Sequence, residues 1–212
     1  MNLSTLERWV LDALLRRLRI LAARQVEQYC QIHGLEQTAK QVLRTLKRKG
    51  LVESFTTETI VLDLASPLFV WSPETDPPAD FSKIGWQAKS RFLRSEPREH
   101  QVLIATELAE RLFGGIGGSL RQPNQVLHDL GTASTYLSRK ANDIESRTTW
   151  TSEDVLRRSW RHLNLKKIPD AALIVDEKIV NVIEFAGRDY GRAYLEKFHR
   201  YWQRRATSYE IW

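Results

Sequence analysis

An amphipathic segment from Leu35 to Lys49, stopped by Gly50, constrains the fold of this chain more than any other feature. Four apolar residues in it recur at the i, i+3, i+4, i+7 spacing of a helix: Ala39, Val42, Leu43 and Leu46. A helix with one apolar stripe must bury that stripe against neighbouring elements. The segments on either side of residues 35–49 should therefore fold around this helix.

Two further helices are predicted before it. Ser4-Thr5-Leu6-Glu7 has the pattern of a capping box and opens a helix that should end near Arg19. A second helix should run through Val26 to Ile32 and end at Gly34, since glycine readily adopts the left-handed conformation that stops a helix.

A β-hairpin is predicted after it. Leu51–Phe55 and Thr59–Leu64 are rich in β-formers and flank Thr56-Thr57-Glu58, which we interpret as the turn. Three helices followed by a hairpin is the element order of a winged helix-turn-helix domain, and the run from Leu43 to Val52 resembles the junction between recognition helix and wing in such domains.

The face of the third helix opposite its apolar stripe carries only amides and cations: Gln37, Lys40, Gln41, Arg44, Lys47 and Arg48. Gln and Arg can form paired hydrogen bonds with base edges, and Lys neutralises phosphates. These six residues are predicted to contact the major groove of double-stranded DNA. Binding of protein, or simple solvation of the charged face, is the alternative interpretation.

Charge is unevenly distributed along the chain. Residues 1–50 hold ten Lys and Arg against four Asp and Glu, residues 51–156 hold ten against fifteen, and residues 157–212 hold twelve against seven. The two basic ends can each attract a polyanion.

No apolar run approaches the roughly 20 residues that cross a bilayer, Cys30 is the only cysteine, and no secretory signal is evident. We expect a cytoplasmic protein that does not enter membranes.

The segment Ser72–Asp80 concentrates proline and acidic residues, so we place a domain boundary there. The predicted domains are 1–70, a linker 71–84, and 85–212. Beyond the linker, Ser82–Phe92 is predicted to be helical. A strand from His100 should lead to a helix over Glu107–Phe113, capped by Thr106 and stopped by Gly114.

The C-terminal region has the predicted order α-β-β-β-α-β. The elements are a helix over 132–142, strands over 146–151, 168–175 and 179–186, a helix over Tyr190–Arg205 and a strand over Ser208–Trp212. Pro169-Asp170 begins the second strand, and Glu184-Phe185-Ala186 ends the third.

This order resembles the core of the restriction-endonuclease-like nucleases, whose signature is Pro-Asp, a spacer, and Asp/Glu-x-Lys. The resemblance implies that Asp170 and Glu184 hold Mg²⁺ in an active enzyme. Ala186 stands at the lysine position, so we expect neither catalysis nor a bound metal. If the chain is active, Asp170, Glu184 and Lys197 are the catalytic candidates, with Arg188 a second possible source of the displaced cation.

A second resemblance spans most of residues 1–205. The replication-relaxation family of plasmid and mobile-element proteins joins a winged helix to four short motifs, matched here by His128-Asp129-Leu130, Pro169-Asp170-Ala171, Glu184, and Lys197 to Tyr201. This resemblance implies an accessory protein of plasmid replication or transfer, which acts with another replication, transfer or recombination protein. The acid that the family carries two residues after Glu184 is replaced by Ala186.

The predicted fold class is α+β: an N-terminal winged helix-turn-helix and a restriction-endonuclease-like domain. The leading hypothesis is a non-enzymatic DNA-binding protein without a cofactor. A metal-dependent nuclease using Asp170 and Glu184 is the first alternative, and a protein-interaction module is the second. The five histidines and one cysteine lack zinc-site spacing, and His128 is interpreted as a core or helix-start residue.

Overall fold

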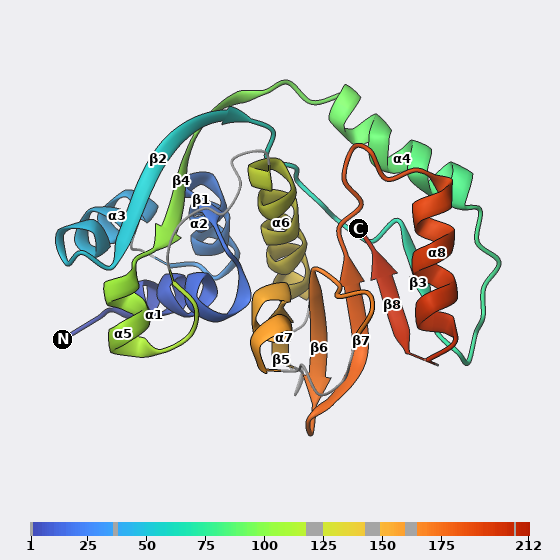
Figure 1. The fold of residues 1–212 in the computed structure, drawn as a ribbon. Helices are drawn as coiled ribbons and strands as arrows, with labels where there is room; N and C mark the ends of the chain where they lie inside the picture. The colour runs from blue at the N-terminus through green and yellow to red at the C-terminus, as the bar shows by residue number, and fades with distance from the viewer. Residues whose placement is uncertain (1, 36–37, 118–124, 143–148, 160–164, 206) are drawn as a thin grey trace. The chain divides into compact units, whose positions relative to one another are not determined.

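A computed structural model describes residues 2–35, 38–117, 125–142, 149–159, 165–205 and 207–212 (Figure 1). The described chain has a mixed α+β fold with a three-stranded and a five-stranded sheet. Within these residues, no helix combines the length and the apolar character that a membrane span requires.

The chain forms two compact units, and each consists of two separate segments. Unit 1 comprises Met1–Val61 and Pro97–Ala141, and unit 2 comprises Leu62–Glu96 and Asn142–Trp212. The sequence analysis placed one boundary at 71–84, but residues 71–84 lie inside unit 2. The difference arises because the chain leaves unit 1 after β2 and returns to it with β4, a non-local pairing that composition does not reveal.

Unit 1 contains α1 (Thr5–Asp12), the π-helix η1 (Ala13–Arg17), β1 (Leu21–Ala22), α2 (Ala23–Ile32), α3 (Ala39–Arg48), β2 (Val52–Thr59), β4 (Arg98–Ala105), α5 (Glu107–Phe113) and α6 (Val126–Asn142). Several predicted boundaries are confirmed. The Glu7 amide donates to Ser4 Oγ at 3.2 Å and the Ser4 amide to Glu7 Oε2 at 3.0 Å, which completes the capping box. Gly34 and Gly50 adopt φ of 59° and 68°, the left-handed conformation that ends α2 and α3.

The predicted hairpin is wrong. β2 runs straight through Thr56-Thr57-Glu58 and pairs antiparallel with β4 over its whole length, from Val52 opposite Ala105 to Thr59 opposite Arg98. The supposed turn has no Gly, Asn or Asp, and its threonines are strand formers, so the backbone has no local reason to reverse. β1 pairs with the other edge of β4, which gives the order β1-β4-β2.

A buried glutamine connects α2 to α6 within unit 1. Gln25 is fully buried, and its amide nitrogen donates to Leu130 O at 2.9 Å and Ser134 Oγ at 3.0 Å. Its oxygen accepts from the Ala22 amide at 2.9 Å. Each of the two donor hydrogens and the oxygen therefore has a partner, as burial of an amide requires.

Unit 2 contains β3 (Phe69–Trp71), α4 (Phe81–Leu93), β5 (Thr149–Ser152), α7 (Glu153–Ser159), β6 (Ala171–Val175), β7 (Lys178–Glu184), α8 (Arg192–Gln203) and β8 (Ser208–Ile211). Its sheet has the order β3-β8-β7-β6-β5, with β7 and β8 parallel and the other neighbours antiparallel. The predicted strands and helices occur in the predicted order, and α7 is an addition. The helix predicted over 132–142 is the end of the longer α6, and all but its last residue belongs to unit 1.

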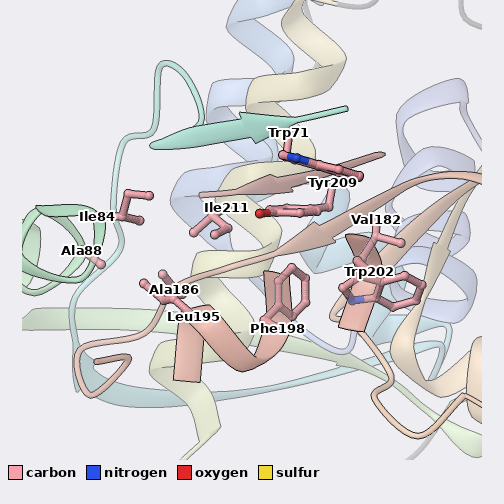
Figure 2. Packing of buried hydrophobic residues seen from close by; sticks show 10 residues of the cluster. All are labelled: Trp71, Ile84, Ala88, Val182, Ala186, Leu195, Phe198, Trp202, Tyr209 and Ile211. Atoms are coloured by element: carbon pink, nitrogen blue, oxygen red, sulfur yellow. The ribbon is translucent and has the colours of Figure 1, made fainter. Parts of the chain in front are cut away.

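One face of this sheet packs against α4 and α8 (Figure 2). The cluster comprises Trp71, Ile84, Ala88, Val182, Ala186, Leu195, Phe198, Trp202, Tyr209 and Ile211. The aromatic side chains of this cluster lie between the helices and the strands. Burial of each large apolar side chain there contributes about 1.5–3 kcal/mol to the stability of the fold. This packing fixes α8 beside the ends of β6 and β7, where the two predicted carboxylates lie.

Candidate functional site

Helix α3 separates its apolar and charged residues as predicted. Ala39, Val42, Leu43 and Leu46 are at most 4% exposed. The polar residues described on the opposite side are all exposed: Lys40, Gln41, Arg44, Lys47 and Arg48. Gln37, the sixth predicted contact residue, lies outside the described residues.

The start of α3 differs from the prediction because of a second capping box. Thr38 is the N-cap, and its hydroxyl accepts from the Gln41 amide at 3.3 Å while Gln41 Oε1 accepts from the Thr38 amide at 3.1 Å. The helix therefore begins at Ala39 rather than near Leu35. Gln41 therefore caps the helix, which its predicted role in base readout did not include. Its side-chain oxygen accepts from the Thr38 amide, so only its amino group remains to donate to a base.

The far end of α3 is attached to α1. Lys49 Nζ contacts Glu7 Oε2 at 3.2 Å and Asn2 O at 2.9 Å, and Glu7 is only 5% exposed. Lys49 therefore neutralises a buried carboxylate, and it differs from Lys47 and Arg48, which stand in solvent in the last turn.

The β2–β4 ladder adds a cation and a histidine that the sequence analysis missed. The predicted wing tip had no cation, but the true partner of β2 brings Arg98 opposite Thr59 and His100 opposite Thr57. Burial, followed by the nearby Arg24 and Arg98 guanidinium groups, lowers the pKa of His100. The sequence gives no signal that Arg24 lies near His100, because this proximity depends on the pairing of β1 with β4.

In unit 2, Asp170 and Glu184 lie at the facing ends of two neighbouring strands. Asp170 precedes β6 and Glu184 ends β7, next to the paired residues Ala171 and Ile183. Asp170 Oδ2 accepts from the Phe185 amide at 2.8 Å. The predicted juxtaposition of the two acidic residues is therefore present in the fold.

Tyrosines and a lysine surround Glu184, which is 3% exposed. The Tyr194 hydroxyl donates to Glu184 Oε1 at 2.6 Å, and the Tyr190 ring lies 4.3 Å from the Tyr194 ring. Burial, and then the charge of Glu184, raise the pKa of both phenols, so each stays protonated as a donor.

Lys167 is a site residue that the sequence analysis missed. Its Nζ lies 4.3 Å from the Tyr194 ring centroid and 5.9 Å from that of Phe198. Burial lowers the pKa of Lys167, the Glu184 carboxylate raises it, and Lys197 lowers it. Its position three residues before Asp170 was visible in the sequence, but its direction toward Tyr194 depends on how the segment packs against α8.

The positions proposed for the displaced cation are both exposed. Lys197 lies on α8 and Arg188 lies in the loop before it. Ala186, at the expected lysine position, is fully buried in the cluster of Figure 2, and its amide donates to Trp212 O at 2.7 Å. A lysine at position 186 would have to enter this apolar packing.

The His128-Asp129-Leu130 motif lies on α6 in unit 1. Asp129 Oδ1 contacts Arg19 Nη1 at 3.3 Å, and Leu130 is fully buried in the core of that unit. Two of the three motif residues therefore have stabilising contacts inside unit 1.

Asp170 and Glu184 are the two carboxylates that the fold places on neighbouring strands as candidate metal ligands. Among the described residues, no group of three or more His, Cys, Asp or Glu side chains is placed to hold a metal ion. A cation at this place needs oxygen ligands besides these side chains, such as backbone carbonyls, water or a phosphate.

Comparisons of this chain with protein-family models, with curated proteins and with solved structures found no match. The resemblances described from the sequence therefore rest on its motifs and on the order of its elements.

Proposed function

We propose that this chain binds double-stranded DNA and that unit 1 is a winged-helix domain with α3 as its recognition helix. The element order α1-β1-α2-α3-β2-β4 and the sheet order β1-β4-β2 support this assignment. In this interpretation the wing strands are β2 and β4, and the chain segment of unit 2 between them replaces a short wing loop.

The observation that carries the proposal is the exposed face of α3. Lys40, Arg44, Lys47 and Arg48 extend from a helix that is fixed by its buried stripe and by the Thr38–Gln41 cap. A rigid helix whose free face holds cations and amides suits the major groove, which admits one α-helix and presents acceptor-rich base edges.

A salt titration tests the proposal. Duplex binding, followed by fluorescence anisotropy, should weaken steeply as salt rises, because each phosphate contact releases counterions and lowers the slope of log K against log salt by about 0.9. The Lys47→Ala/Arg48→Ala variant should bind more weakly and with a shallower slope. The matched control is Lys83→Ala/Lys89→Ala, which removes two exposed lysines from α4. Binding that is insensitive to salt, or an α3 variant that behaves like the control, contradicts the proposal.

We further infer that unit 2 is a restriction-endonuclease-like domain without catalytic activity. The antiparallel β5-β6-β7 strands and the crossover through α8 to the parallel β8 support this interpretation. Together with the motifs that resemble the replication-relaxation family, this suggests an accessory role in plasmid replication or transfer.

A metal-dependent nuclease is the second candidate, favoured by the neighbouring positions of Asp170 and Glu184 and by the Lys167 ammonium beside them. In such an enzyme the carboxylates hold the cation, and a lysine orients the attacking water. We expect no cutting, because Glu184 is buried and bonded to Tyr194. Supercoiled plasmid incubated with the protein and magnesium or manganese should stay intact. Nicking that is lost in both Asp170→Ala and Glu184→Ala variants makes the nuclease the correct assignment.

A further inference from the structure

One edge of α8 gathers cations from two parts of the chain. Helical spacing places Tyr194, Lys197, Tyr201, Arg204 and Arg205 along this edge. The segment before β6 lies beside it, because the Lys166 amide donates to the Tyr201 hydroxyl at 3.0 Å and Lys167 Nζ lies over the Tyr194 ring. We call Lys166, Lys167, Lys197, Arg204 and Arg205 the α8 basic edge.

The acid on α8 does not neutralise this edge. Glu196 accepts from Arg192 Nε at 2.5 Å, and both lie on the opposite side of the helix. Within the described part of the chain, Lys166, Lys197, Arg204 and Arg205 form no ion pair with a carboxylate. Lys167 and Lys197 are close enough to repel each other. Like charges gathered this way are costly alone and become favourable when a polyanion lies against them.

The tyrosine rings along this edge hold cations in place, and this determines what kind of ligand the edge can bind. Lys167 covers the Tyr194 ring at 4.3 Å, and the Arg205 guanidinium covers the Tyr201 ring at 4.9 Å. Bases of a single strand stack on open aromatic faces. Here those faces are used to hold cations, so the edge offers charge at fixed positions rather than a stacking platform.

We propose that the α8 basic edge contacts the phosphate backbone of duplex DNA without reading its sequence. From Lys197 to Arg204 the helix advances about 10 Å, and each strand of a duplex presents a phosphate about every 3.4 Å along its axis, so more than one phosphate lies within reach of the edge. The inference rests on the proposed DNA-binding function. It states that unit 2 adds to the DNA affinity that α3 provides.

The test is a salt titration of the full-length Lys166→Ala/Lys197→Ala variant on a random-sequence duplex and on a single strand of equal length. Both lysines are exposed, so the variant should unfold at the wild-type temperature. On the duplex, the magnitude of the slope should fall by about 1.8, from two lost phosphate contacts. The Lys83→Ala/Lys89→Ala control, which removes the same charge from α4 of the same unit, should keep the wild-type slope.

The outcomes separate this inference from the proposed function. If the α8 variant matches the control while Lys47→Ala/Arg48→Ala loses affinity, the basic edge is not a DNA contact and the role of α3 stands. If the α8 variant loses duplex affinity and the α3 variant does not, the edge is confirmed and the recognition role of α3 is wrong. A loss confined to the single strand overturns the duplex assignment. Wild-type slopes for every variant contradict both, and an acidic protein then becomes the partner to seek.

Discussion

The charged residues of α3 are exposed to solvent, and the buried apolar stripe of the same helix holds it in place. Glu184, in the acidic site of unit 2, is instead buried. Lys40, Arg44 and Lys47 are exposed, but Glu184 is 3% exposed and accepts a hydrogen bond from Tyr194. An exposed cation is available to a ligand at little desolvation cost. A buried, hydrogen-bonded carboxylate stabilises its surroundings and must exchange its partner before it binds anything else. Of the two regions, α3 is therefore the better prepared for binding.

The largest effect is expected from restoring the missing lysine. Ala186→Lys places a long cationic side chain in a fully buried site of the unit 2 core, so overpacking and an unpaired buried charge should cost about 4 kcal/mol or more of unfolding free energy. Urea unfolding measures this cost. Ala193→Lys, at an exposed position of α8, is the matched control and should change stability by less than about 0.5 kcal/mol. A stable Ala186→Lys variant that nicks plasmid would reverse the comparison of the two regions.

An intermediate effect is expected on α3, in binding rather than in stability. Arg44→Ala should cost about 1–3 kcal/mol of discrimination between a duplex selected from a random pool and an unselected one, since it would remove the proposed base contact. Lys47→Ala should weaken both duplexes alike, because its proposed contact is with phosphate. Both residues are exposed, so the unfolding temperature should not change. Equal losses on the two duplexes for both variants place sequence readout elsewhere, with Arg98 on β4 the next residue to test.

The smallest effect is expected from the tyrosine that binds Glu184, and it depends on pH. Burial, and then Glu184, raise the pKa of Tyr194, so its phenol is more easily ionised in the unfolded chain than in the folded one. The stability that this group contributes is present below about pH 10, the ordinary tyrosine value, and is lost as pH rises toward the folded pKa. Urea unfolding at pH 8 and at pH 11 should show a smaller alkaline loss for Tyr194→Phe than for the wild type. Equal losses indicate that Tyr194 is not held protonated beside Glu184.

Unit 1 provides the reference for that measurement. Burial raises the pKa of Tyr136 to about 12, in a part of the chain that holds neither Asp170 nor Glu184. Tyr136→Phe should therefore also reduce the alkaline loss, mainly through burial, with Arg17 lowering and Asp12 raising the same pKa. The comparison shows how the alkaline loss of a buried tyrosine away from Asp170 and Glu184 differs from that of Tyr194.

Elements encoded by short-range signals could be predicted from the sequence. The Ser4–Glu7 capping box, the stops at Gly34 and Gly50, and the strand-to-helix junction at Thr106 each depend on residues within one or two turns of each other. The apolar stripe of α3 follows from the helical period alone, and so does the exposure of its cations. The positions of Asp170 and Glu184 on adjacent strands also followed from local order, because a tight turn at Asp176 and Glu177 joins β6 to β7.

Long-range pairing was decided only by the tertiary structure. β2 hydrogen-bonds to β4 rather than to the residues that follow it, so the predicted hairpin failed and both units became discontinuous. Long-range packing also brings Lys167 onto Tyr194 and buries Ala186 against α4 and α8. Helix α7 and the first part of α6 were not predicted. For the other helices, the sequence by itself determined the approximate bounds and the apolar side, since these depend on a period and on caps. It left open which strand pairs with which, because backbone hydrogen bonds between distant strands are nearly independent of side-chain identity, and packing against a whole core selects among them.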